Sequence, residues 1–102
     1  MKIIGELSDL IDDELCDAEK YAKLALKFKE SMPDVADLFY LISLEESKHM
    51  NLLHGYVVKL VNELRDNTEP LAEGMRLAYE HIHEHEIKKE QGVRSLQAMF
   101  KE

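Results

Sequence analysis

The sequence predicts an all-α protein with a single domain spanning residues 1–102. Apolar residues recur at steps of three and four along nearly the whole chain, which is the period of an α-helix. Two short segments that contain proline, 30–34 and 66–70, interrupt this period. We therefore expect an antiparallel hairpin of two long helices followed by a third helix.

The first helix is expected over about residues 2–31, where no proline interrupts the pattern. Its predicted core stripe consists of Ile3, Leu7, Leu10, Ile11, Ala18, Tyr21, Ala22, Ala25 and Phe28. The middle of this stripe is acidic, with Glu14 and Asp17. At about 100° per residue, Glu14 lies only about 20° from the line of Leu7 and Ala25. We therefore expect Glu14 to face the core.

The second helix is expected over about residues 34–65, with Pro33 at its opening turn. The connection is so short that the two helices must run antiparallel. The predicted stripe consists of Val35, Leu38, Phe39, Ile42, Leu53, Tyr56, Val57, Leu60 and Leu64. Its middle is also polar, with Glu45, Glu46 and His49.

The third helix is expected over about residues 70–100, with Thr68 as its cap and Pro70 in its first turn. The predicted stripe consists of Leu71, Met75, Ala78, Ile82, Val93, Leu96 and Phe100. The polar residues in the middle of this stripe are His85, Glu86 and Lys89.

The composition excludes several classes of partner. The chain has 21 Asp and Glu against 13 Lys and Arg, so its net charge is −8. Nucleic acids and anionic membranes attract basic surfaces, so we expect neither as a partner. No run of about 18 apolar residues is present, so no segment is expected to span a membrane. The single cysteine, Cys16, and the acidic start of the chain favour a cytoplasmic protein.

The polar interruptions of the first two helices are expected to meet. Counted from the turn near residue 32, Glu14 lies 18 residues back, and Glu46 and His49 lie 14 and 17 residues forward. At about 1.5 Å per residue, Glu14 and His49 should reach nearly the same height, with Glu46 one turn away. Carboxylates and imidazole suit iron, manganese and zinc. A buried hydrogen-bond network is the alternative, but His49 can neutralise only one carboxylate.

This pattern resembles the ferritin-like di-iron carboxylate superfamily. There a four-helix bundle takes a Glu from each of two helices and a Glu-x-x-His from each of the other two. Residues 5–65 carry half of that set, Glu14 and Glu46-x-x-His49, and so resemble encapsulated ferritins and short rubrerythrin-related proteins. The resemblance implies a homodimer, or a larger oligomer of dimers, that completes one bundle. It also implies a shared site for two iron ions and a ferroxidase reaction, the oxidation of Fe(II) by O₂. Some such proteins reside in a protein compartment, although we identify no shell-targeting extension after Phe100.

Other polar residues are weighed against this site. Glu80 and His83 form a second Glu-x-x-His, but both point away from Leu71 and are expected on the surface. His85 lies within about 40° of the stripe, so it is a further ligand, a hydrogen-bond partner of a ligand, or a buried histidine. Glu45 is either an acceptor for the second nitrogen of His49 or an ordinary surface acid.

The remaining interpretations are less specific. Tyr21 and Tyr56 are expected to face the core, Cys16 is expected to be inert, and Lys89 to pair with Glu86 or extend to solvent. Two other functions stay open. One is a non-enzymatic helical interaction module whose polar belt sets helix register, and the other is a structural zinc or manganese site without turnover.

Overall fold

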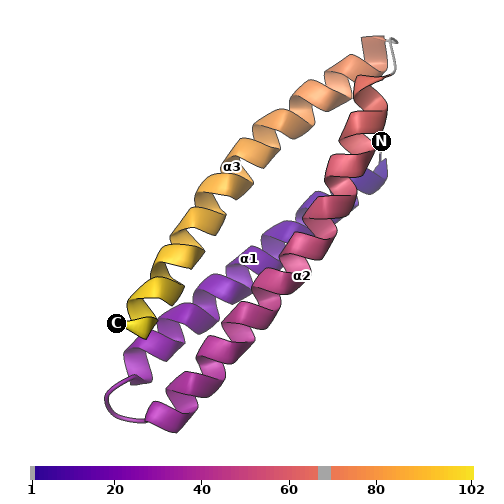
Figure 1. Ribbon diagram of the computed structural model, residues 1–102. Coiled ribbons are helices and arrows are strands. Elements are labelled where there is room, and N and C mark those ends of the chain that lie inside the picture. Colours follow the sequence, from indigo (N-terminus) through magenta and orange to yellow (C-terminus); the bar gives the residue numbers. More distant parts are fainter. Residues whose placement is uncertain (1, 67–69) are drawn as a thin grey trace.

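The computed structural model describes residues 2–66 and 70–102. Its helices are α1 (Lys2–Phe28), α2 (Pro33–Arg65) and α3 (Pro70–Lys101). α1 and α2 form an antiparallel hairpin, and α3 runs back along it, so that the C-terminus lies near the α1–α2 turn (Figure 1). The predicted all-α class, the hairpin and the third helix are therefore confirmed, and the molecule is an elongated bundle of 57 × 17 × 15 Å.

The helix boundaries follow the prolines. α2 begins at Pro33 because the fixed φ of proline and its missing N–H suit a first helical turn. α1 ends at Phe28, three residues before the predicted end, and residues 29–31 form a turn. The Met32 amide still donates to the Phe28 carbonyl over 2.9 Å, as in a helical turn, but Pro33 has no N–H with which to continue the series. Thr68, the predicted cap of α3, lies outside the described residues.

The main core lies where the three helices face one another. Small side chains on α1 allow close helix packing, and Ala18, Ala22 and Ala25 have no exposed surface. The buried residues of the main cluster are Ile4, Ile11, Leu15, Ala18, Met50, Val57, Leu60, Val61, Tyr79 and Val93. A smaller cluster near the α1–α2 turn includes the stacked rings of Tyr40 and Phe100, whose centroids are 4.7 Å apart.

The core face of each helix is rotated from the predicted stripe. Several residues predicted to be buried are exposed: Ile3, Leu10, Leu38, Tyr56 and Ile82. In their place Leu15, Met50 and Tyr79 are buried. The prediction is wrong here because the helices carry apolar residues on more than one face, and period alone does not say which face the helices share.

A chain of hydrogen bonds joins all three helices. The Ser43 hydroxyl on α2 donates to the Ala18 carbonyl on α1 over 2.7 Å. The Gln97 side-chain amide on α3 donates to the hydroxyls of Ser43 and Ser47 over 3.0 and 3.1 Å. Because Ser43 and Gln97 are buried, these bonds fix the register of α1, α2 and α3 against one another.

An apolar face of the hairpin remains uncovered by α3. Leu38 and Tyr56 lie about 180° around α2 from Ser47, which contacts α3. On α1, Leu10 lies about 160° from Asp12, which also contacts α3. Leu10, Leu38 and Tyr56 are each about half exposed. The side of the hairpin opposite α3 therefore presents apolar surface to solvent.

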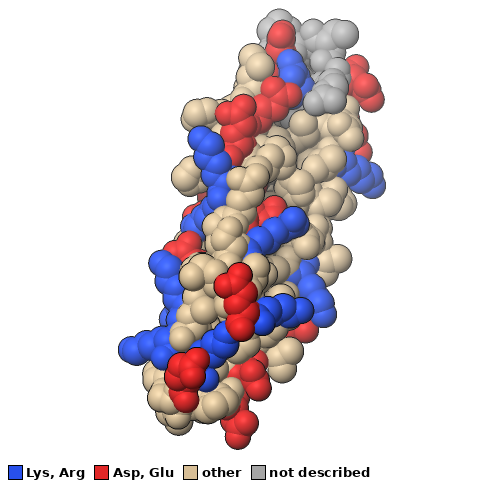
Figure 2. Space-filling view, turned by 60° about the vertical axis from the view of Figure 1, so that its left-hand side comes forward, with Lys and Arg blue, Asp and Glu red and all other residues tan. Residues whose placement is uncertain are grey.

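The charged residues are distributed over the outside of the bundle. Figure 2 shows acidic and basic side chains interspersed on one face, with uncharged surface running along the molecule between them. No helix in the described ranges combines the length and the hydropathy needed to cross a membrane.

Candidate metal centre

Glu14, Glu46 and His49 meet between α1 and α2. One donor atom of each lies within 4.8 Å of the donor atoms of the other two. Nδ1 of His49 is 3.4 Å from Oε2 of Glu14 and 3.8 Å from Oε2 of Glu46. The sequence-based expectation that these three side chains converge is therefore confirmed, while metal binding by them stays a prediction.

The register of the hairpin explains this convergence. Glu46 and His49 are one helical turn apart and therefore share a side of α2. The bond from Ser43 to the Ala18 carbonyl lies one turn from the cluster on each helix, since Ala18 follows Glu14 by four residues. That buried bond holds Glu14 at the height of the other two side chains.

The carboxylates in the cluster compete for a proton. A hydrogen bond with Glu14, together with burial and the negative charge of Glu14, raises the pKa of Glu46 to about 7, although His49 acts in the opposite direction. Oε2 of Glu14 is buried and has no hydrogen-bond partner within the described residues. Two carboxylates this close are stabilised by one shared proton or by a cation in its place.

The cluster lies at the edge of the hairpin and not in the core, which corrects the prediction. The side chains of Glu14 and Glu46 are 25% and 21% exposed, and that of His49 is 52% exposed. The cluster is exposed because the core face of α2 is rotated from the predicted stripe. His49 lies about 160° around α2 from Ser47, which contacts α3, and so faces away from α3. One chain therefore leaves the cluster open on the side of the uncovered apolar face.

Two further candidate residues stand apart from the cluster. Glu45 is exposed, forms an ion pair with Lys48 at 3.3 Å and lies outside the group of three. His85 is exposed on α3 and lies outside the group of three. Within residues 2–66 and 70–102, Glu14, Glu46 and His49 are the only group of three or more His, Cys, Asp or Glu side chains close enough to share an ion.

The second Glu-x-x-His is more buried than predicted. His83 is half-buried, and its Nδ1 lies 3.0 Å from Nε2 of His54 on α2, with the two rings nearly parallel at 6°. Nδ1 of His83 is also 3.4 Å from the Tyr79 hydroxyl. The prediction that His83 is on the surface, made from its angle around the helix relative to Leu71, is wrong. The buried face of α3 is centred near Tyr79, and His83 is only about 40° from Tyr79. Glu80 is partly buried and pairs with Arg76 at 2.7 Å.

Lys89 has partners that the sequence did not indicate. Its Nζ is 3.0 Å from Oδ1 of Asp12 and 2.7 Å from Sγ of Cys16, so it joins α3 to α1 instead of pairing with Glu86. Cys16 therefore contacts an amine, although it is exposed as expected for a residue outside the core. These contacts depend on how α3 packs against α1, and no local pattern in the sequence reports that.

Comparison with known proteins gives no relative for this chain: no protein-family model, curated protein or solved structure matches it. We therefore infer function from the chain's own residues. Two carboxylates and an imidazole at this spacing form a donor set for a divalent cation, and the exposure of His49 leaves space for ligands from outside the chain.

Proposed function

We propose that this chain binds metal through Glu14, Glu46 and His49, as half of a ferritin-like two-metal site shared between two chains, and that the site oxidises Fe(II) with O₂. One observation carries the proposal. Three ligand atoms from two helices lie within 4.8 Å of one another, and the buried Oε2 of Glu14 has no hydrogen-bond partner in the described chain. A buried carboxylate oxygen without a hydrogen bond is costly even with the His49 imidazole 3.4 Å away, and a cation at this point removes that cost.

The charge of the ligands suits two divalent ions in a dimer. With neutral histidines, one chain supplies two negative charges from Glu14 and Glu46, so two chains supply about four. Two divalent cations balance that charge. Within one chain the nearby Glu14 carboxylate raises the pKa of Glu46, and only a proton or His49 offsets the negative charge of the pair.

The uncovered apolar face suits a second copy of the chain. Leu38, Leu52 and Tyr56 are exposed on the side of α2 that also carries His49. A second hairpin on this face gives a four-helix bundle with the ligands inside it, which is the arrangement of ferritin-like proteins. In a twofold dimer the same residues meet across the axis, so each chain completes the ligand set of the other.

Each side chain has a distinct part in this site. His49 offers a ring nitrogen to one ion, and Glu14 and Glu46 hold the ions and neutralise their charge. Bound iron supplies one-electron redox chemistry toward O₂. Protonation of Glu46 competes with metal, so metal affinity is expected to fall as the pH drops below about 7.

A structural zinc site is the second candidate. Two carboxylates and one imidazole at one point are also ligands that zinc takes. A zinc site would bind metal but consume no O₂, so the two candidates differ in a measurable way.

The first prediction concerns metal content and oxygen use. Protein purified without chelators or a histidine tag is expected to bind about one iron per chain and to consume O₂ when Fe(II) is added. Glu46→Gln keeps the side-chain shape but removes the charge that attracts the metal, so both properties should be lost. Glu45→Gln is the matched control, because Glu45 is the neighbouring exposed residue and should behave as wild type. Metal analysis and an oxygen electrode measure the two properties.

Each outcome separates the candidates. Wild-type protein that takes up no Fe(II) contradicts the metal site and favours an interaction module. Metal bound without oxygen consumption favours the structural site. Equal iron loss in Glu45→Gln and Glu46→Gln would mean that the overall negative charge, and not the cluster, attracts the metal.

A further inference from the structure

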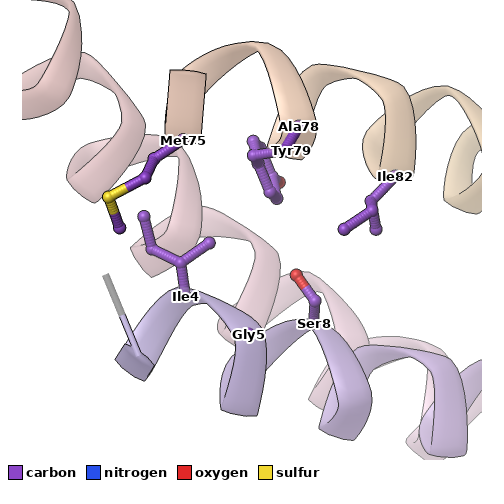
Figure 3. A pocket seen from close by; sticks show the side chains of 7 residues that line it. All are labelled: Ile4, Gly5, Ser8, Met75, Ala78, Tyr79 and Ile82. Carbon is purple, nitrogen blue, oxygen red and sulfur yellow. The ribbon is translucent and has the colours of Figure 1, made fainter. Parts of the chain in front are cut away.

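A second candidate site lies between the first turns of α1 and the first half of α3. It is a cavity of about 190 Å³. Figure 3 shows Ile4, Gly5 and Ser8 of α1 facing Met75, Tyr79 and Ile82 of α3 across it, with Ala78 beside Tyr79. We call it the α1–α3 pocket. None of its lining residues carries a formal charge, and all of its walls except the Ser8 and Tyr79 hydroxyls are apolar.

Ser8 gives the α1–α3 pocket its one unsatisfied polar group. It is 6% exposed, and its hydroxyl has no hydrogen-bond partner within the described residues. The hydroxyl points from α1 toward α3 in Figure 3. A buried hydroxyl without a partner costs about 1–3 kcal/mol. By contrast, the Tyr79 hydroxyl already lies 3.4 Å from Nδ1 of His83. A ligand that hydrogen-bonds to Ser8 would remove this cost.

The size and walls of the pocket define the class of ligand. An enclosed cavity of about 150 Å³ lined by aliphatic and aromatic side chains takes up benzene. The α1–α3 pocket has a similar volume and similar walls but is open to solvent on one side, so it suits one aromatic ring with a small polar substituent. Met75 and Tyr79 are favourable contacts for an aromatic ring. No cation is present among the lining residues to pair with an anionic ligand, and the chain is itself acidic.

We propose that the α1–α3 pocket binds a neutral single-ring molecule with one hydroxyl group, of the phenol class, whose hydroxyl bonds to Ser8. This inference does not rest on the proposed metal function. The pocket lies between α1 and α3, whereas the metal cluster lies between α1 and α2. Ser8 also precedes Glu14 by six residues, about 9 Å along the helix. A ligand in this pocket joins α3 to α1 and stabilises the folded chain.

The test uses phenol with toluene as its isosteric partner without a hydroxyl, and benzoate as its charged relative. Binding is followed by calorimetric titration and by the rise in melting temperature with ligand concentration. Phenol is expected to bind about fivefold tighter than toluene, which corresponds to one hydrogen bond of about 1 kcal/mol, and benzoate is expected not to bind. In Ser8→Ala the preference for phenol over toluene should disappear.

A pair of glycine variants tests the location. A Cβ at either Gly5 or Gly92 meets nothing within 4 Å, and both glycines are helical and exposed, so leucine can be accommodated at both. Gly5→Leu fills the pocket and should abolish phenol and toluene binding, whereas Gly92→Leu should bind as wild type does.

Three results would overturn the proposal. The first is wild-type protein that phenol neither binds nor stabilises. The second is a Gly5→Leu variant that binds phenol as well as Gly92→Leu does, which would place the ligand elsewhere. The third is a Ser8→Ala variant that keeps the full preference for phenol. None of these measurements involves metal. A negative result would therefore overturn the pocket proposal without bearing on the proposed oxidation chemistry.

Discussion

At the scale of single residues, Glu86 is the group in the least favourable surroundings. It is buried in α3, and neither of its carboxylate oxygens has a hydrogen-bond partner in the described chain. Burial, and then the negative charge of Asp12, raise the pKa of Glu86 to about 7. Lys89 is one turn away but contacts Asp12 and Cys16 instead. Between about pH 4.5 and pH 7, the folded protein therefore holds a proton on Glu86 that the unfolded chain releases.

This proton makes stability depend on pH. A folded-state pKa raised above the unfolded value of 4.5 means that stability is fully present below pH 4.5 and falls as the pH rises through about 7. Glu86→Gln has no carboxyl group to ionise at this position. Its free energy of unfolding relative to wild type should therefore rise by about 1–2 kcal/mol from pH 4 to pH 9. Urea unfolding at several pH values measures it, with Glu84→Gln, at an exposed position, as the control. Parallel pH curves for wild type and Glu86→Gln would contradict the assignment.

At the scale of elements, α3 is held to the hairpin by a buried amide. Gln97 donates to Ser43 and Ser47 on α2, and Ser43 in turn donates to the Ala18 carbonyl on α1. Loss of the Gln97 amide would leave the buried Ser43 hydroxyl and the partly buried Ser47 hydroxyl without their donor, while apolar contacts and Lys89 would still hold α3.

Removal of that amide should loosen α3. Gln97→Ala is expected to destabilise the protein by about 2 kcal/mol, since it removes one buried and one partly buried hydrogen bond and leaves a small cavity. Gln91→Ala, at an exposed position of the same helix, should change stability by less than about 0.5 kcal/mol. Urea unfolding measures both, and amide hydrogen exchange should show faster exchange in α3 of Gln97→Ala. Equal stability of the two variants would show that apolar packing alone holds α3.

The same scale shows which features the sequence can predict. The helices and the meeting of Glu14 with His49 follow from local properties: the helical period, Pro33 and a short connection that sets heights at about 1.5 Å per residue. The rotation of each helix could not be predicted in this way, since two apolar faces compete on α1 and α2. The contact of His83 with His54 depends on the packing of α3 against α2, which leaves no periodic signal in the sequence.

At the scale of the whole molecule, the apolar face and the metal cluster lie on the same side. The hairpin buries Ile11, Leu15 and Val57 in the core but leaves Leu38, Leu52 and Tyr56 exposed on the side of α2 that carries His49. Large apolar surface on a folded chain commonly marks an interaction site. In the proposed dimer a second copy would also add ligands to the half-set of Glu14, Glu46 and His49, so self-association and metal binding are expected to be linked.

That linkage gives the last prediction. Leu52 is 76% exposed, one turn after His49, and about 140° around α2 from Ser47, which contacts α3. Leu52→Glu should weaken the dimer at least about tenfold, because a charge would be buried in an apolar interface, and it should lower iron content although no ligand is changed. Leu77→Glu is the control, since Leu77 is 53% exposed on α3. Analytical ultracentrifugation and metal analysis at several protein concentrations measure both effects. A wild-type monomer that holds two metal ions would contradict the shared site, and a Leu52→Glu monomer with full iron content would separate metal binding from dimerisation.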